Sequence, residues 1–247
     1  MDDKGEVGAL ARGLALLHTV ASGGPMSVKD LAAATSIPKA TVSRLVGTLL
    51  AAGYLRQQEG STLCRLGPVF LAMGNAYLND VDVREMLRPH LLNVANLAGA
   101  KVNLGVRNGL EIVVIDSVRP RNAVILSYIE IGARMGLATS AAGRAYLASL
   151  GEEERLAVME ELREAGGSTW RSTAARLGDA FLEYKELGYC SSFGEWHPEI
   201  NAIGVALRGP AGERYAVNCG GPVYRLTPDL LRQQVAPALL RATNDWT

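Results

Sequence analysis

The feature that most constrains the fold is the stretch from residue 27 to residue 55, whose sequence predicts two short helices separated by a turn. Ser27 can cap the first helix, and Asp30 stands three residues later, as in a capping box. Pro38 fixes its own φ and disfavours the α conformation at Ile37, so the first helix has to end before the second begins. Two short helices set at an angle in this way are typical of a helix-turn-helix, which we place at about residues 27–47.

The second of these helices has two faces of different chemistry. Apolar residues at i, i+3, i+4 and i+7 form the face that belongs against a core, namely Val42, Leu45, Val46 and Leu49. The opposite face can donate to phosphate oxygens or to a guanine edge, and its small side chains permit close approach to DNA. The predicted DNA contacts on this face are Lys39, Ala40, Thr41, Ser43, Arg44 and Thr48. The alternative is the ordinary solvated face of a helix in an all-α domain.

The neighbouring segments favour a DNA-binding domain. An apolar stripe predicts another helix from about residue 9 to residue 21, and two short strands are expected at 54–56 and 63–66, around a polar tip that contains Gly60. Three helices followed by a β-hairpin make a winged helix-turn-helix. We therefore predict a DNA-binding domain over residues 1–67, with its wing at 54–66. The remaining predicted DNA contacts are Arg12, Arg56 and Arg65.

Charge is distributed unevenly along a chain whose net charge is zero. Residues 7–70 carry a net charge of +4, whereas residues 71–247 carry −2. The zero balance argues against a protein that coats nucleic acid without sequence preference. Because an excess of +4 is modest, tight binding to double-stranded operator DNA is expected to need two or more copies, as a homodimer or a dimer of dimers.

A linker helix is predicted between the two domains. Gly67-Pro68 ends the wing, and residues 69–78 have helical periodicity and are nearly all apolar. Such a helix needs a partner, which is either the same helix of a second subunit or the chain's own second domain. We place the linker at residues 68–80 and the second domain at 81–247.

The second domain is predicted to be α+β, with an antiparallel sheet and helices on its faces. Asn108-Gly109 lies between two β-rich runs and is a strong hairpin signal. The expected strands are residues 102–106, 110–116, 123–129, 202–207 and 214–219. The expected helices are residues 83–97, 141–149, 152–164, 174–187 and 228–242.

Five segments resemble the IclR family of bacterial transcription regulators. ARGLALLHTVA at 11–21, the stretch 27–55 and CRLGPVFLAMG at 64–74 are similar to that family's N-terminal domain. Residues 132–150 and 188–222 are similar to its effector-binding domain, in the same order. The resemblance implies a two-domain α+β regulator with a winged helix-turn-helix, a linker helix that pairs in dimers, and a GAF-like domain that binds a small-molecule effector.

The effector site is expected at the start of the helix 141–149. Free backbone N–H groups there can meet a carboxylate as they would a phosphate, and small residues let a ligand approach closely. The resemblance implies contacts from Ala141, Ala142, Ser192, Ala202, Asn218 and Gly220. Further expected residues are Gly143 at the helix start, the apolar walls Leu104 and Met135, and Glu195 in a loop beside Trp196 and His197.

The sequence departs from the family pattern at three of these positions. Ser192 stands where some relatives carry an acidic residue, and Asn218 and Gly220 stand where hydroxyls often occur. Trp196 and His197 can close over an aromatic ligand, or Trp196 can simply pack on its own loop. The expected effector is a small organic acid or an aromatic carboxylate.

An enzyme is the main rival interpretation. None of the three histidines follows a nucleophile or metal motif, and GxSxG, HExxH and P-loop patterns are absent. Cys190 or Cys219 with His197 is a thiol–imidazole candidate, and a winged helix that binds only proteins is a third hypothesis, disfavoured by Lys39 and Arg44. We therefore predict no catalytic residue and no cofactor.

Cysteine spacing and hydropathy indicate the compartment. Three widely spaced cysteines without a CxxC pair argue against a structural disulfide or a metal site. No segment has the length and apolarity of a membrane span, and the initial MDDKGEVG is acidic and polar, unlike an export signal. The sequence predicts a cytoplasmic protein.

Overall fold

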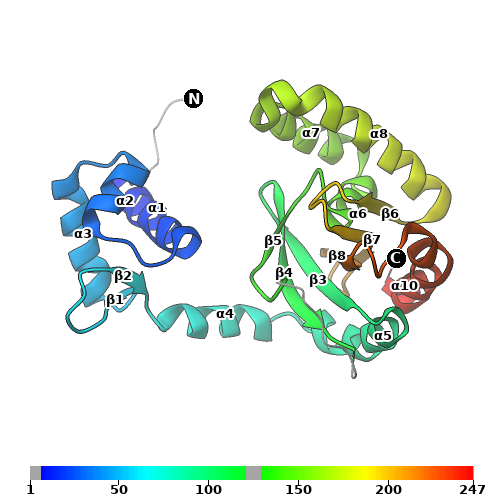
Figure 1. Ribbon diagram of the computed structural model, residues 1–247, viewed down its shortest axis with the longest axis horizontal. Coiled ribbons are helices and arrows are strands. Elements are labelled where there is room, and N and C mark those ends of the chain that lie inside the picture. Colours follow the sequence, from blue (N-terminus) through cyan, green and yellow to red (C-terminus); the bar gives the residue numbers. More distant parts are fainter. Residues whose placement is uncertain (1–6, 121–128, 247) are drawn as a thin grey trace. The chain divides into compact units, whose positions relative to one another are not determined.

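The computed structural model describes residues 7–120 and 129–246, and the chain divides into two compact units, Met1–Val81 and Asp82–Thr247 (Figure 1). The two-domain α+β fold predicted from the sequence is confirmed. Each unit has its own hydrophobic core, so each is described by itself.

The first unit contains three helices, a two-stranded hairpin and a fourth helix. Its elements are α1 (Gly8–Gly23), α2 (Val28–Thr35), α3 (Lys39–Ala51), β1 (Leu55–Gln57), β2 (Cys64–Leu66) and α4 (Val69–Asn79). Leu16, Leu31 and Val42 are fully buried at the centre of the three-helix core. The predicted winged helix-turn-helix is therefore present. Helix α1 agrees with the expected residues 9–21 within two residues, whereas α3 continues four residues beyond the expected end at residue 47.

Local signals explain where α2 begins and ends. The Ser27 hydroxyl accepts from Asp30 N at 3.2 Å, and the Asp30 carboxylate accepts from Ser27 N at 3.3 Å, which completes the predicted capping box. The Ser27 hydroxyl also donates to Asp30 Oδ2 at 2.7 Å, and this hydrogen bond, followed by that from Ser27 N, lowers the pKa of the Asp30 carboxyl. The helix ends at Thr35 and is followed by Ser36, whose φ of 56° is left-handed, and Pro38 then precedes α3.

The second unit is built on a six-stranded sheet in the order β5-β4-β3-β8-β7-β6, in which each neighbouring pair is antiparallel. The strands are β3 (Lys101–Asn108), β4 (Glu111–Val118), β5 (Arg134–Gly136), β6 (Cys190–Phe193), β7 (Ile200–Arg208) and β8 (Arg214–Pro222). The two predicted hairpins form the four longest of these strands.

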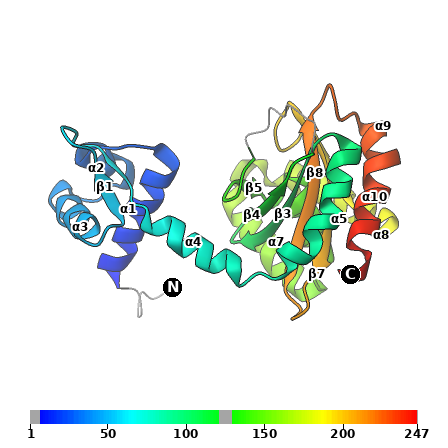
Figure 2. The ribbon, with the colours of Figure 1, turned by 90° about the horizontal axis from the view of Figure 1, so that it is seen from below.

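Helices cover both faces of this sheet (Figure 2). One face is covered by α6 (Ala141–Ser149), with α7 (Glu152–Gly166) and α8 (Trp170–Leu187) packed beyond it. The other face is covered by α5 (Val83–Ala98) and by a C-terminal run of α9 (Pro228–Leu230), a π turn (Leu231–Val235) and α10 (Ala236–Thr243). The sheet is therefore the middle of three layers.

The structure differs from the sequence prediction at the sheet edges and at the C-terminal helix. The short edge strands β5 and β6 were not expected, because three or four residues are too few to show a β pattern. The helix expected at 228–242 contains a π turn just before Pro237, which has no N–H to continue the regular ladder. Most of the strand expected at 123–129 lies outside the described residues.

Candidate DNA-binding face and effector site

The outer face of α3 carries the residues that the sequence nominated for DNA contact. Lys39, Ala40, Ser43, Arg44 and Thr48 are exposed, and Thr41 is half-buried. Val42 and Val46 point into the core and hold this face outward. At the start of α3, Pro38 O accepts from the N–H groups of Thr41 and Val42, and no side chain caps the helix. Its first N–H groups are therefore available to an anion.

Arg12 of α1 joins this face. A depression of about 400 Å³ between α1 and α3 is lined by Ala9, Arg12, Thr41, Arg44, Leu45 and Thr48. Arg12 also donates from Nε to Gly8 O at 2.8 Å, which orients its guanidinium along α1. Tertiary packing thus places two guanidinium groups, separated by 32 residues in the chain, beside one groove.

The two arginines of the wing lie directly opposite each other. Arg56 and Arg65 are paired in the β1–β2 register, and both side chains are exposed. Like charges at directly opposed positions of a hairpin destabilise it, and a bound anion offsets that repulsion. The arrangement concentrates two positive charges at one point of the wing, where a phosphate can lie between them.

In the second unit, the start of α6 lies on the middle of the sheet. A Cβ built on Gly204 of β7 would stand 2.4 Å from Ala141 O and 2.7 Å from Ala142 N, so only glycine permits this approach. Gly204 pairs with Asn218, and Ser192, Ala202 and Gly220 form the adjacent row across β6, β7 and β8. Paired residues share a face of a sheet. The structure therefore brings together six predicted effector residues: Ala141, Ala142, Ser192, Ala202, Asn218 and Gly220.

The polar groups of this region are partly used by the protein itself. Ser140 caps α6 by accepting from Gly143 N at 3.0 Å, and Ser192 Oγ donates to Thr139 O at 2.8 Å. Among the hydrogen bonds of the described residues, none occupies the N–H groups of Ala141 and Ala142. These two donors at a helix N-terminus are the arrangement that binds a carboxylate.

Two further polar residues of the same face were missed in the sequence. Asn103 of β3 pairs with Asn218, and its amide nitrogen lies 3.5 Å from the Asn218 side-chain oxygen. Ser117 of β4 donates to the Asn103 oxygen at 2.8 Å. The signal available in the sequence was an asparagine between Val102 and Leu104 in a β-rich run. Together, Ser117, Asn103 and Asn218 form a polar row across three strands.

Leu104 and Gly143 were also predicted to contact the effector, but the structure places them differently. Leu104 pairs with Asp116, whose carboxylate binds Arg88 of α5, so Leu104 lies on the opposite face of the sheet. Its position was assigned from hydrophobicity alone, which does not reveal register. Gly143 packs its Cα against the Leu137 backbone, where an added Cβ would lie 2.3 Å from Leu137 O. Met135 is buried in the same core cluster as Ala142.

Glu195 is held by two arginines. Arg144 of α6 forms a bidentate pair with it, at 2.7 Å from Nη1 to Oε1 and 2.8 Å from Nη2 to Oε2. Arg176 of α8 lies 3.3 Å from Oε2. The Arg144 side chain is almost fully buried, and its hydrogen bonds lower the pKa of the Glu195 carboxyl. Glu195 therefore anchors its loop to α6 and α8, and its carboxylate is already occupied.

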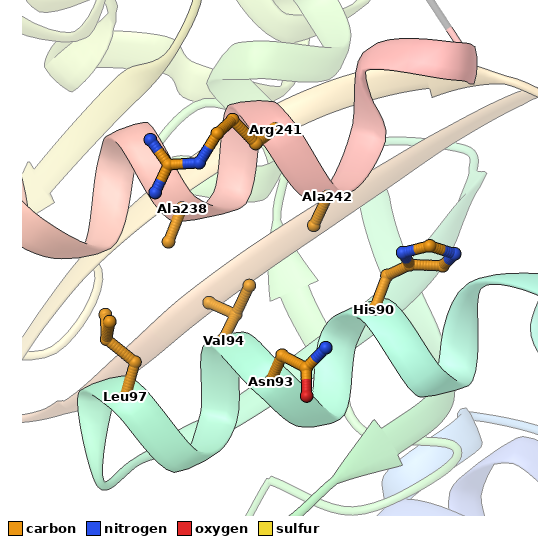
Figure 3. A pocket seen from close by; sticks show the side chains of 7 residues that line it. All are labelled: His90, Asn93, Val94, Leu97, Ala238, Arg241 and Ala242. Atoms are coloured by element: carbon orange, nitrogen blue, oxygen red, sulfur yellow. The ribbon is translucent and has the colours of Figure 1, made fainter.

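A separate groove lies between α5 and α10, on the other face of the sheet. It has a volume of about 300 Å³ and is lined by His90, Asn93, Val94, Leu97, Ala238, Arg241 and Ala242. Figure 3 shows Val94 and Leu97 of α5 pointing toward α10, and Ala238 and Ala242 of α10 pointing toward α5. None of the predicted effector residues lines this groove, so it is distinct from the region at the start of α6.

Comparison with known proteins identifies the family. Residues 9–59 match the IclR helix-turn-helix domain, and residues 75–246 match the bacterial transcriptional regulator IclR C-terminal family. The chain belongs to the IclR family. The fold and the exposed recognition helix agree with this assignment.

Relatives of this IclR-family chain are themselves regulators. It is 31% identical to the HTH-type transcriptional repressor AllR of Escherichia coli over 90% of this chain and 82% of AllR. It is 29% identical to the HTH-type transcriptional regulator TsaQ1/TsaQ2 of Comamonas testosteroni, over 98% of this chain and 87% of the relative. The crystal structure of an IclR family transcriptional regulator from Brucella abortus shares 34% identity with a TM-score of 0.88, covering 99% of this chain and 93% of that one. The chain is a DNA-binding transcription regulator and not an enzyme.

The cysteines of this IclR-family chain are poor nucleophiles. Burial raises the pKa of the Cys219 thiol to about 12 and also raises that of Cys190, whose Sγ donates to Ala180 O. His197 is exposed, and its Nδ1 accepts from Glu199 N at 3.3 Å. No thiol–imidazole pair is formed by these three residues. Within residues 7–120 and 129–246, no cluster of metal-ligating side chains occurs, and no helix there is long and apolar enough to cross a membrane.

We expect Glu195→Gln to lower the free energy of unfolding by roughly 2 to 3 kcal/mol at pH 7, because it breaks the ion pair with the buried Arg144. The loss is smaller than for a fully buried ion pair, because Glu195 keeps 26% of its side-chain surface exposed. Since the folded-state pKa of Glu195 lies below its ordinary value of 4.5, its contribution is present above that pH and is lost as pH falls through the folded pKa. Urea unfolding from pH 7 to pH 3 measures both effects.

The matched control is Glu160→Gln, which removes the carboxylate of the exposed Arg163–Glu160 pair on α7. Exposed pairs contribute little, so the free energy of unfolding is expected to change much less than in Glu195→Gln. Equal effects of the two substitutions at pH 7 would show that the Arg144–Glu195 pair does not hold the loop.

Proposed function

We propose that this IclR-family regulator binds double-stranded operator DNA through the outer face of α3, and that its affinity for the operator changes when a small carboxylate binds at the start of α6. The observation that carries the DNA-binding half is the exposed face of α3, with Arg44 beside Arg12 and with the buried Val42 fixing its orientation. Because operator DNA is its target, we infer that the protein acts in the bacterial cytoplasm.

The proposed contacts divide into base readout and phosphate positioning. Arg44 is the residue that can fork onto a guanine edge, while hydroxyls and the other cations hold the backbone. The small side chain of Ala40 lets α3 enter the major groove closely. The phosphate-positioning group consists of Arg12, Lys39, Thr41, Ser43, Thr48, Arg56 and Arg65.

The exposed apolar surface of the first unit supports a dimer. No residue of α4 is buried, and Leu71, Met73 and Tyr77 expose 70%, 53% and 51% of their surface. Leu10 and Leu14 of α1 are exposed as well. A helix this apolar is stabilised when a partner covers it. We assign that role to α4 of a second subunit, in a homodimer or a dimer of dimers that places two recognition helices on one operator.

The start of α6 supports the effector half of the proposal. The Ala142 N–H group and the Ala141 carbonyl lie over Gly204, whose strand partner is Asn218, and the adjacent row of the same face is Ala202 and Gly220. Two oriented donors suit a carboxylate, and the alanine methyl groups suit a short apolar or aromatic body. The effector class is therefore a small organic acid or an aromatic carboxylate. Control of DNA affinity requires only that this ligand prefer one arrangement of the protein.

We expect Arg44→Ala to weaken specific operator binding by about 1 to 3 kcal/mol and to leave the melting temperature almost unchanged, because the side chain is exposed. Fluorescence anisotropy with operator and scrambled duplexes measures the specific term. The control is Arg171→Ala, which removes an exposed arginine from α8 in the other unit. Wild-type operator affinity in the Arg44 variant would refute the assigned recognition face.

We expect Leu71→Glu to shift the molar mass in solution toward the 26.3 kDa of one chain, because it places a charge on the proposed α4–α4 contact. Light scattering at several concentrations measures the mass. Leu156→Glu is the control, since Leu156 on α7 is 63% exposed but lies in the effector-binding unit. If the wild type itself has the mass of a single chain at micromolar concentration, the dimer is wrong.

We expect at least one small organic acid or aromatic carboxylate to raise the melting temperature of the wild type, because a ligand at 100 times its dissociation constant adds about 2.7 kcal/mol of stability. A thermal-shift screen of such acids measures this. Ala142→Asp, which places a negative charge at the proposed site, should abolish the shift. A shift that survives this substitution would place the ligand elsewhere.

A further inference from the structure

A buried lysine lies on the same face of the sheet as the proposed effector site. Lys101 begins β3 and retains only 2% of its surface in contact with solvent. It pairs with Gly220, which in turn pairs with Ala202, so Lys101 continues the row that runs from Ser192 across the sheet. Because Gly220 has no side chain, bare backbone separates the lysine from the Ala202 methyl group. The row of Ser192, Ala202 and Gly220 therefore ends at the cationic side chain of Lys101.

The carboxylate that the structure places on this lysine is Glu130. Lys101 Nζ donates to Glu130 Oε1 at 2.7 Å and to Ile129 O at 2.8 Å. Glu130 is 53% exposed and also binds the exposed Arg119. Hydrogen bonds from Lys101 first and Arg119 second lower the pKa of its carboxyl, so Glu130 is an anion at neutral pH. A buried ammonium is thus neutralised by a carboxylate that is itself half in solvent.

This asymmetry makes Glu130 the replaceable member of the pair. A buried ammonium is costly without an anion, so Lys101 keeps a requirement for one. Glu130 loses little by moving into water, because it is already half exposed and keeps Arg119 within reach. A ligand carboxylate entering from the Gly220 side can supply the anion that the lysine needs.

We propose that Lys101 binds the carboxylate of the effector and that Glu130 is an internal competitor which the effector displaces. The inference rests on the proposed effector site at the start of α6 and names the cation of that site. Glu130 precedes β5, whose Met135 packs in the same core cluster as Ala142. Displacement of Glu130 releases the segment leading into β5, so occupancy of the site is converted into a change at the sheet edge.

The test compares Lys101→Met and Glu130→Gln in the full-length protein, with benzoate and pyruvate as probes and benzamide and pyruvamide as their uncharged counterparts. Lys101→Met keeps the stem of the side chain and removes its charge, so calorimetry should show carboxylate affinity falling about tenfold or more, with amide binding changed less. Glu130→Gln removes the competitor and should raise carboxylate affinity several-fold. Glu111→Gln, which removes the carboxylate that pairs with Arg134 on β5, is the matched control and should change neither.

Each outcome decides one point. Unchanged carboxylate affinity in Lys101→Met, or unchanged or weakened affinity in Glu130→Gln, overturns the assignment of Lys101 and its competitor while the effector site itself stands. If Lys101→Met fails to fold, Glu130→Gln decides alone, because its side chain is half exposed. If neither acid, nor any acid of the thermal-shift screen, binds the wild type, the proposed carboxylate site fails and the role of Lys101 fails with it.

Discussion

The approach of the α6 backbone to the β7 backbone is the contact on which the second unit depends. Gly204 permits it, because any Cβ there would overlap Ala141 O. The contact holds the start of α6, with its free N–H groups, against the sheet at Gly204, beside the row of Ala202 and Gly220. Arg144, one turn further along α6, then reaches Glu195 and holds the neighbouring loop. One backbone contact thus positions the N–H donors of α6, the sheet residues beneath them and the loop of Glu195 around the proposed effector site.

Both units offer an anion the same combination of groups. In each, a helix N-terminus has free N–H groups, and arginine or lysine side chains stand nearby: Arg12 and Arg44 at α3, and Lys101 on the sheet face below α6. The surroundings differ, and this decides what binds. The cations at α3 are exposed, which suits a large polyanion such as DNA. Lys101 is buried, which suits one carboxylate removed from water.

Helices, hairpins and the fold class were accessible from the sequence because their signals are local. The capping box at Ser27, the turn at Asn108-Gly109 and the apolar stripe through Val42 each depend on neighbouring residues. Register across the sheet was not accessible, because it is set by strand pairing between distant segments. Leu104 was therefore placed on the wrong face, and Asn103, Ser117 and Lys101 were not singled out at all.

The sequence by itself determined the order of the elements, the amphipathic faces of α3, the family and the basic character of the first unit, because periodicity, caps and charge need no partner. Only the tertiary structure decided which residues meet. It placed Arg12 beside Arg44, occupied Glu195 with Arg144, and set Lys101 at the end of the Gly220 row. Those contacts join segments far apart in the chain, and their geometry follows from packing and register.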